Sequence, residues 1–361
     1  MTHPIVKVAG SSGCQSYIVG CPETRQALLV DPKVGQEATY RNLIEAYGLT
    51  LSGTLDTHTH ADHLSATSRF LRDGVPLAMS GATTSQREKR ALADGDTVEV
   101  GSLAFRVIEV PGHTPDSIAL FGHGMCITGD SLFVGGLARA DFRGSDPEQL
   151  FDSVQARLMT LPDETLVFPG HGYEDLLFST IGKERESNPA LQHASGAAYA
   201  EALGAVEGAG NSEAVDEMLA MNLEADPELP ESPGTVAACC ASPGDARGRA
   251  TIGEVTPEDR SEDFAALGEH AQWVDVRDPF EYEHGHIPGT DNIPLGELGF
   301  HLDDLKRRPS PLYLSCRSGV RSMTAARTLK HLGVVAEPVN VMGGILRWQD
   351  AGLPIIGEPA S

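Results

Sequence analysis

The chain is short of positive charge and of long apolar runs. Its 361 residues include 27 Lys and Arg against 51 Asp and Glu, a formal net charge of −24. Because such a surface repels phosphate backbones and anionic lipids, we expect neither nucleic acid nor a membrane as a partner. No stretch approaches the roughly 20 apolar residues of a membrane-spanning helix, and the sequence begins without a signal-peptide pattern. We therefore expect a cytoplasmic protein, and the sequence leaves a homo-oligomer open.

Cysteine is also scarce, and its spacing excludes two common uses of this residue. The six cysteines are Cys14, Cys21, Cys126, Cys239, Cys240 and Cys316. They match neither a zinc-finger pattern nor the disulfide framework of a small secreted protein. We expect mostly free thiols in a reducing compartment.

The length is sufficient for two or three domains. Residues 226–250 are rich in Pro, Gly, Ala and Ser, which is typical of a linker. The sequence therefore predicts an N-terminal domain at residues 1–225 and a smaller domain at residues 251–361. Both alternate short apolar runs with helical patterns, so the fold class is α/β.

In the N-terminal domain, buried strands are expected at residues 27–32, 52–57, 103–110, 125–130 and 165–170. Residues 146–160 are expected to form a helix, because Asp146 can cap it and Pro147 suits the first helical position. Residues 190–224 have amphipathic helical patterns.

Histidines and aspartates follow several of these apolar runs. They are His58, His60, Asp62, His63, His113, Asp130 and His171. Each of the last three comes directly after a glycine, which allows a tight turn. Because strand ends gather functional loops, we expect these side chains to meet. Imidazole and carboxylate ligands together suit zinc, iron or manganese rather than calcium or magnesium, so the pattern predicts a metal centre.

The stretch THTHADH at residues 57–63, with Gly-His113, Gly-Asp130 and Gly-His171, resembles the metallo-β-lactamase superfamily. The resemblance covers residues 1 to about 190 and implies a four-layer αββα sandwich with the metal at one edge. Two branches stay open. In binuclear hydrolases such as glyoxalase II, one metal takes His58, His60 and His113, and a second takes Asp62, His63 and His171, with Asp130 bridging. In persulfide dioxygenases, one iron takes His58, His113 and Asp130, and the other four residues orient these ligands.

The stretches at 135–142, 166–173 and 179–191 resemble the persulfide dioxygenases more than the hydrolases. Arg139 and Arg185 are candidates for holding the carboxylates of a tripeptide thiol, with exposed salt bridges as the alternative. Tyr173 is a candidate for a substrate hydrogen bond, with core packing as the alternative.

In the second domain, strands are expected at residues 273–278, 311–316 and 338–344, and a helix at 318–333. Cys316 lies between a strand and this helix, in the stretch LSCRSGVRS. Gly319 permits a tight loop whose amides can converge on the sulfur, and Arg317 and Arg321 add positive charge. Both effects favour the nucleophilic thiolate.

The cysteine loop, with VDVRDPFEYEHGHIPG upstream and VMGGILRW downstream, resembles the rhodanese sulfurtransferases over about residues 251–357. The resemblance implies a small α/β domain with a mainly parallel sheet and a Cys316 persulfide. The loop residues expected to hold the sulfur substrate are Arg317, Ser318, Gly319, Val320 and Arg321. Asp275 and Arg277 are expected to organise the core, and Glu283 and His286 to lie near the pocket.

Together the resemblances imply an enzyme that oxidises glutathione persulfide, or a similar persulfide, with O₂ at one Fe(II) per chain, giving sulfite and glutathione. The second domain would move sulfur between thiosulfate, sulfite and thiols. Two alternatives stay open: a binuclear zinc thioesterase with an attached rhodanese domain, and a non-enzymatic sulfur carrier or sensor.

Overall fold

The computed structural model describes residues 3–9, 13–172, 176–204, 213–225, 251–258 and 272–357. The chain forms two compact units, Met1–Tyr173 with Phe178–Ala246, and Glu174–Leu177 with Arg247–Ser361. The predicted linker at 226–250, the Cys239–Cys240 pair and Tyr173 lie outside the described residues.

The first unit contains two six-stranded sheets. In one sheet the order is β1-β2-β3-β4-β5-β6, antiparallel from β1 to β3 and parallel from β3 to β6. Its strands are β1 (Ile5–Ala9), β2 (Ser16–Gly20), β3 (Gln26–Val30), β4 (Thr50–Leu55), β5 (Leu77–Ser80) and β6 (Arg90–Leu92).

In the other sheet the order is β14-β13-β10-β9-β8-β7, antiparallel except for the parallel pair β10 and β13. Its strands are β7 (Thr97–Val100), β8 (Leu103–Glu109), β9 (Ile118–Gly122), β10 (Met125–Gly129), β13 (Leu166–Pro169) and β14 (Ser179–Thr180). A short hairpin of β11 (Leu132–Phe133) and β12 (Gly136–Leu137) follows β10.

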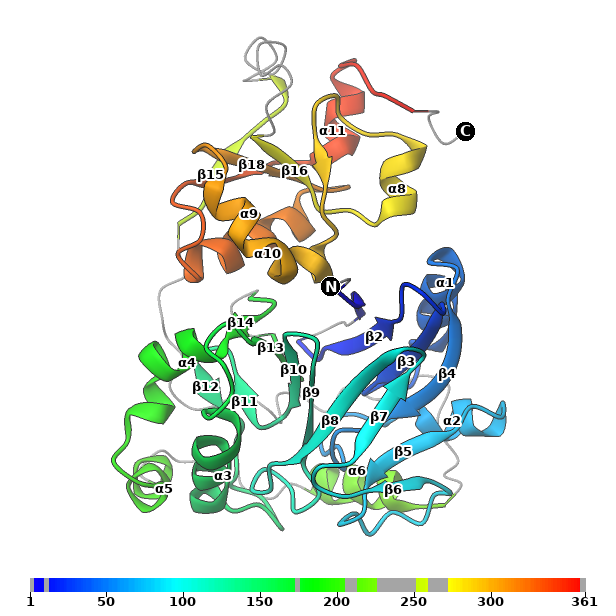
Figure 1. Cartoon of the computed structure of the whole chain (residues 1–361), viewed down its shortest axis with the longest axis vertical. Helices are drawn as coiled ribbons and strands as arrows, with labels where there is room; N and C mark the ends of the chain where they lie inside the picture. Colours follow the sequence, from blue (N-terminus) through cyan, green and yellow to red (C-terminus); the bar gives the residue numbers. More distant parts are fainter. Residues whose placement is uncertain are drawn as a thin grey trace. The chain divides into compact units, whose positions relative to one another are not determined.

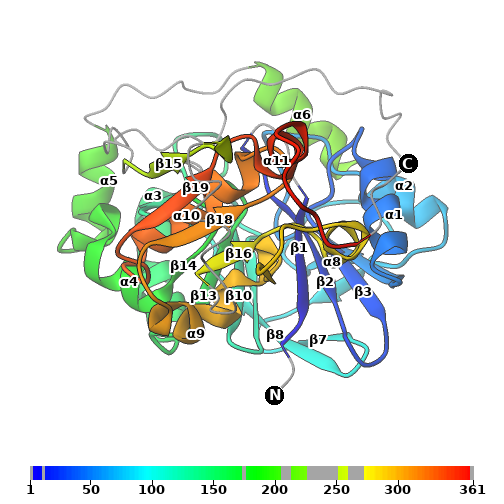
Figure 2. The same ribbon diagram turned by 90° about the horizontal axis from the view of Figure 1, so that it is seen from above.

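Helices cover the outer faces of both sheets. Figure 2 shows α3, α4 and α5 on one side of the sheets and α1 and α2 on the other. The helices of this unit are α1 (Glu37–Ala46), α2 (Thr67–Arg72), α3 (Pro147–Ser153), α4 (Ile181–Ser187), α5 (Gly196–Gly204) and α6 (Glu213–Leu223). A 3₁₀ turn spans Pro189–Gln192. The layer order confirms the predicted αββα sandwich.

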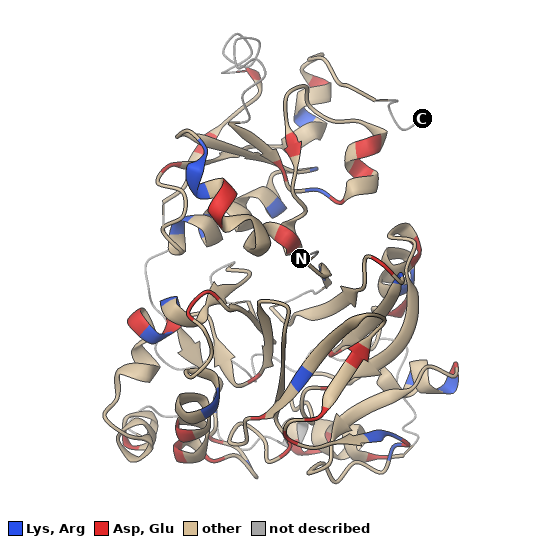
Figure 3. Ribbon diagram, viewed as in Figure 1, with Lys and Arg blue, Asp and Glu red and all other residues tan. Residues whose placement is uncertain are grey.

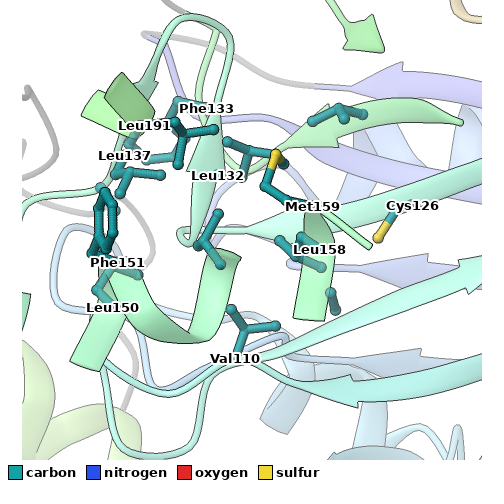
Figure 4. Packing of buried hydrophobic residues seen from close by; sticks show 14 of the residues in the cluster. Val110, Cys126, Leu132, Phe133, Leu137, Leu150, Phe151, Leu158, Met159 and Leu191 are labelled. Carbon is teal, nitrogen blue, oxygen red and sulfur yellow. The ribbon is translucent and has the colours of Figure 1, made fainter. Parts of the chain in front are cut away.

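Helix α3 begins as the sequence predicts, since the Asp146 side chain accepts a hydrogen bond from Gln149 N at 3.0 Å. The expected single helix over 146–160 is, however, an α-helix followed by a π-helical turn at Val154–Leu158. The turn still buries Val154 and Leu158, so the apolar face that predicted the helix is preserved. Figure 4 shows Leu150 and Phe151 of α3 in the apolar cluster that also contains Val110, the residue after β8.

The second unit contains one five-stranded sheet in the order β15-β19-β18-β16-β17, and every pair is parallel. Its strands are β15 (Gly253–Val255), β16 (Trp273–Asp275), β17 (Asp291–Asn292), β18 (Leu312–Ser315) and β19 (Pro338–Val341). Its helices are α8 (Pro279–His284), α9 (Leu302–Arg307), α10 (Val320–His331) and α11 (Gly344–Asp350), with a 3₁₀ segment at Leu295–His301 (Figure 1). The predicted small domain with a parallel sheet is confirmed.

The cysteines Cys14, Cys21, Cys126 and Cys316, which lie within the described residues, are free thiols. Among the described helices, none combines the length and the apolar character that crossing a membrane requires.

Candidate functional site

Metal-ligating side chains meet where strands of the first unit end. His58, His60 and His63 follow β4, His113 follows β8, Asp130 follows β10 and His171 follows β13. The ring centroids of His58 and His113 lie 5.1 Å apart, and His171 Nδ1 lies 3.0 Å from Asp130 Oδ1. The residues that the sequence spreads over more than a hundred positions therefore surround one point.

Hydrogen bonds behind His58 fix the tautomer of its ring. The Thr57 hydroxyl donates to Asp31 Oδ2 at 2.8 Å and lies 3.0 Å from His58 Nδ1. Because this hydroxyl has one proton and gives it to Asp31, His58 Nδ1 is the donor to Thr57. The lone pair of His58 is then on Nε2, the nitrogen that faces Asp130.

His113 is oriented in the same way. Its Nδ1 lies 2.7 Å from the carbonyl oxygen of Arg139, which can only accept, so Nδ1 carries the proton. The Nε2 atoms of His113 and His58 lie 3.7 and 4.0 Å from Asp130 Oδ2. Backbone or carboxylate partners of this kind commonly fix metal-ligating imidazoles.

The three groups fit a metal ion. One donor atom from each of His58, His113 and Asp130 lies within 4.8 Å of the other two, and all three side chains are buried. Within the described residues, His58 Nε2 and Asp130 Oδ2 have no hydrogen-bond partner. Burial holds the pKa values of His58 and His113 below the usual imidazole range, which favours the neutral, ligating form. Burial alone would raise the pKa of Asp130, but the neighbouring His171, His58 and His113 outweigh it and lower that pKa.

His60 has different partners. Its Nε2 lies 3.2 Å from Asp31 Oδ1 and 3.8 Å from Asp56 Oδ1. Burial opposes protonation, yet these two carboxylates outweigh it and raise the pKa of His60 well above its usual range. Asp31 thus links His60 to the Thr57–His58 pair, a role that the sequence analysis did not assign.

His171 lies between two carboxylates. Its Nδ1 is 3.0 Å from Asp130 Oδ1, and its Nε2 is 3.1 Å from Asp62 Oδ2. Each ring nitrogen of His171 therefore faces a carboxylate oxygen. His63 Nδ1 is 3.1 Å from Asp62 as well. Burial would raise the pKa of Asp62, but His63 and His171 hold it well below the carboxyl range.

Cys14 adjoins this group and was not recognised from the sequence. Its Sγ is 3.2 Å from Asp62 Oδ2 and accepts from Lys33 Nζ at 3.4 Å. Burial would raise the pKa of Cys14, but hydrogen bonds with His171 and His63 lower it to about 7. The only local signal is its position just before β2, which carries no chemistry by itself.

Asn222 of α6 holds the loop that carries the histidines. Its Nδ2 donates to the carbonyl oxygens of His60 and His63, each at 2.8 Å, and its Oδ1 accepts from Ser65 N at 3.0 Å. No sequence pattern pointed to this residue, which lies far from the loop in the chain.

The residues predicted to contact the substrate in this unit, Arg139, Arg185 and Tyr173, lie in different environments. Arg139 is buried beside His113 and donates to Asp141 Oδ1 at 2.5 Å. Arg185 pairs with Asp163 and donates to the carbonyl of Met159 at 2.6 Å, so its guanidinium braces the turn after α3. Tyr173 lies outside the described residues, and its role stays a prediction.

In the second unit, Cys316 follows β18 and is 1% exposed. Gly319 has φ +92°, the left-handed conformation that the tight loop needs, and its N–H donates to Cys316 Sγ at 3.1 Å. The Ser322 hydroxyl lies 3.4 Å from the sulfur and 2.7 Å from Asn340 Oδ1. Ser322 therefore belongs to the sulfur site, although the sequence analysis ended the loop at Arg321.

The two loop arginines differ. Arg321 makes a two-point ion pair with Glu281, at 2.6 and 2.7 Å, whereas Arg317 is exposed. The sequence analysis placed Glu283 near the pocket, but Glu283 is exposed and Glu281 contacts the loop arginine. His286 instead stacks on Tyr282, at 3.8 Å between ring centroids. Arg277 is buried and pairs with Asp275 at 2.6 Å, as expected for a core pair.

A cavity of about 340 Å³ adjoins the cysteine loop. Its walls include Ser318, Gly319, Val320, Met323, Arg327 and Met342. This volume lies at the lower end of the range of small-molecule sites.

Comparison with known proteins assigns both units to families. A model of the metallo-beta-lactamase superfamily matches residues 82–171, a range that includes His113, Asp130 and His171. A model of the rhodanese-like domain matches residues 261–351, which include Cys316.

Individual relatives match the first unit. The mitochondrial persulfide dioxygenase ETHE1 of Bos taurus is 35% identical over 180 residues, 49% of this chain and 70% of the bovine protein. The hydroxyacylglutathione hydrolase of Xanthomonas campestris pv. campestris is 39% identical over 150 residues, 41% of this chain and 57% of that protein. The crystal structure of ETHE1 from Myxococcus xanthus superposes with a TM-score of 0.58 at 33% identity, covering 60% of this chain and 97% of that chain.

Proposed function

The chain belongs to the persulfide dioxygenase family of the metallo-β-lactamase superfamily and carries a C-terminal rhodanese-like domain, and on this premise we propose that it oxidises glutathione persulfide, or a similar small persulfide. The overall reaction converts one persulfide, one O₂ and one water into one thiol, one sulfite and two protons. The sulfane sulfur loses four electrons, and O₂ takes up four. The observation that carries the proposal is the buried set of His58, His113 and Asp130, whose donor atoms face one another.

We propose one Fe(II) per chain as the cofactor. Two imidazoles and one carboxylate are the ligands of many non-haem iron oxygenases. When bound, the iron supplies the redox chemistry with O₂ and a position for a thiolate-type sulfur. Thr57 and the Arg139 carbonyl keep His58 and His113 in the tautomer that presents Nε2. Asp130 brings the negative charge, and His171 holds its other oxygen.

Arg139 is the proposed contact for the substrate. Its backbone carbonyl contacts His113, and its buried guanidinium lies 5.9 Å from the centroid of the Phe142 ring. A buried positive charge there suits the anionic persulfide or a carboxylate of the thiol. Arg185 is a weaker candidate because it is exposed and donates to the carbonyl of Met159. Tyr173 lies outside the described residues.

At the second site Cys316 is the proposed nucleophile for sulfur transfer. Its thiolate attacks the sulfane sulfur of thiosulfate, the S–S bond of the donor breaks, and sulfite leaves with the bonding electron pair. A thiol then takes the sulfur from the Cys316 persulfide and becomes a persulfide, which is the substrate of the first site. The Gly319 amide, which donates to Cys316 Sγ, stabilises the charged sulfur. The reverse direction forms thiosulfate from sulfite.

A binuclear thioesterase is the second candidate function. It is favoured by the hydrolase relative and by the second group of potential ligands, Cys14, Asp62 and His63. Against it stands the match to the persulfide dioxygenase, which extends over 180 residues, whereas the hydrolase match extends over 150.

Metal analysis combined with oxygen uptake separates these functions. The protein is loaded with Fe(II) or Zn(II), desalted and assayed for bound metal, for O₂ uptake with glutathione persulfide, and for hydrolysis of a glutathione thioester. We expect one iron per chain, with O₂ consumed and sulfite formed in equal amounts. Two zinc ions with thioester hydrolysis would instead establish the second candidate. No turnover of either substrate would favour a sulfur carrier.

A further inference from the structure

Helix α8 is acidic (Figure 3), and Glu281 in its first turn contacts Arg321 of the cysteine loop. The Glu281 carboxylate binds both terminal nitrogens of Arg321, with Nη1–Oε2 at 2.6 Å and Nη2–Oε1 at 2.7 Å. Asp278 Oδ2 lies 3.6 Å from the same guanidinium. Arg321 was expected to add positive charge around Cys316, but these two carboxylates offset that charge.

Arg317 is the other positive group of the loop. It is exposed, and within the described part of the second unit its side chain forms no ion pair or hydrogen bond. Arg317 and Arg321 thus stand against Asp278 and Glu281, and the cavity beside the loop adds Arg327 and Glu254, so the formal charges cancel. A site of this kind gains little from a second negative charge on its substrate. The net charge of −24 for the whole chain adds no attraction for a dianion.

We propose that Glu281 is a specificity-determining residue of the Cys316 site. Because of Glu281, this site prefers sulfur donors with one negative charge over dianionic thiosulfate. This inference rests on the proposed sulfur transfer at Cys316. Persulfide anions and thiosulfonates are donors of the favoured class. Thiosulfate remains a substrate, with a lower kcat/KM.

Both donor classes react by the same step. The Cys316 thiolate bonds to the terminal sulfur of the donor, and the S–S bond of the donor breaks. With thiosulfate, sulfite leaves; with a thiosulfonate, a sulfinate leaves. In each case the leaving group keeps the bonding electrons, and Cys316 ends as a persulfide. The two donors therefore differ mainly by one charge.

The position of Glu281 allows its charge to be removed with little change of structure. Its Oε2 also accepts from Asp278 N at 3.0 Å, which completes a capping box at the start of α8. Since Gln is as suitable as Glu at this position of a capping box, Glu281→Gln keeps the cap and, through its amide oxygen, one of the two contacts with Arg321. Glu337→Gln is the matched control, because Glu337 is exposed and precedes β19 at the end of the sheet opposite Cys316.

The experiment measures kcat/KM for thiosulfate and for methanethiosulfonate, with cyanide as the common acceptor, in the full-length protein. In the wild type we expect the monoanion to be the better donor. Glu281→Gln should raise kcat/KM for thiosulfate by about tenfold, mainly through KM, and that for methanethiosulfonate by clearly less. Glu337→Gln should leave both values unchanged.

Salt provides a readout that a purely structural brace would not affect. The gain of Glu281→Gln should shrink at 1 M salt, where the screening length is about 3 Å. The inference is overturned if Glu281→Gln leaves the ratio of kcat/KM for the two donors unchanged, or lowers kcat/KM for both donors alike. It is also overturned if Glu337→Gln changes kcat/KM to the same extent. If neither donor adds a sulfur atom to Cys316 in the wild type, as judged by mass spectrometry, the sulfur-transfer proposal itself fails. If Cys316 takes up sulfur but Glu281→Gln does not change the ratio of kcat/KM for the two donors, only the role of Glu281 is rejected.

Discussion

The Nε2 atom of His60 lies 3.2 Å from Oδ1 of Asp31, and the other oxygen of Asp31 accepts from Thr57 at 2.8 Å. One carboxylate therefore supports two neighbours, the charged ring of His60 and the hydroxyl that fixes His58. In the histidine-rich stretch, His58 therefore presents a lone pair, and His60 supports His58 through Asp31. This difference leads to the first prediction.

Replacing His58, His113 or Asp130 by Ala should abolish both iron binding and persulfide-dependent O₂ uptake, because each removes a proposed ligand. His60→Ala should still bind one iron at saturating Fe(II), with affinity lower by about 10- to 100-fold, since it supports the ligands. Bound iron is measured by elemental analysis after desalting. His123→Ala is the control, because His123 is exposed in the turn between β9 and β10. Full loss of iron in His60→Ala with retention in Asp130→Ala would contradict this ligand set.

Cys316→Ser should lose sulfur transfer almost entirely, because the covalent carrier is gone. Oxygen uptake with supplied glutathione persulfide should persist, since the proposed iron site uses no cysteine. Uptake driven by thiosulfate plus glutathione should stop. Peptide mass spectrometry after thiosulfate treatment checks the route, because the added sulfur should map to Cys316. A sulfur adduct on Cys239 or Cys240, with activity retained in Cys316→Ser, would assign the transfer elsewhere.

Gly170→Ala should weaken iron binding and the fold together. A Cβ at Gly170 would lie 2.2 Å from Asp130 Oδ1, so the carboxylate has to move. We expect a loss of about 1–3 kcal/mol in the free energy of unfolding, as for other overpacked sites, and reduced iron content. Chemical denaturation and metal analysis measure the two effects. Gly204→Ala is the matched control, because a Cβ there meets no atom within 4 Å.

Cys14 should react with iodoacetamide in metal-free protein with a midpoint near pH 7. Its pKa of about 7 means that the reactive thiolate predominates above that pH and disappears below it. Alkylation of the Cys14 peptide in a Cys316→Ser background should therefore rise through neutrality. Cys126 is the internal control, because burial raises its pKa to about 12 and it should stay unmodified. A midpoint near the ordinary thiol value of about 8.5 would show that His63 and His171 do not stabilise the thiolate.

The sequence by itself determined where the reactive groups lie along the fold. Apolar runs predicted the strands, and His113, Asp130, His171 and Cys316 each follow such a run, so their gathering at strand ends could be expected. The cap at Asp146 and the left-handed loop residue Gly319 were also visible, because these are local preferences of single residues.

Only the tertiary structure decided how these groups are held. Asp31 and Asn222 support the histidine loop from distant parts of the chain, and hydrogen bonds between such positions leave no periodic pattern in a sequence. The contact of Arg321 with Glu281, and not with Glu283, also depends on the tertiary structure. Residues two apart on a helix face different sides, and which side meets the loop depends on how α8 packs. Residue type and local propensity act over a few positions, whereas lone-pair direction, charge compensation and close approach arise only when separate segments pack together.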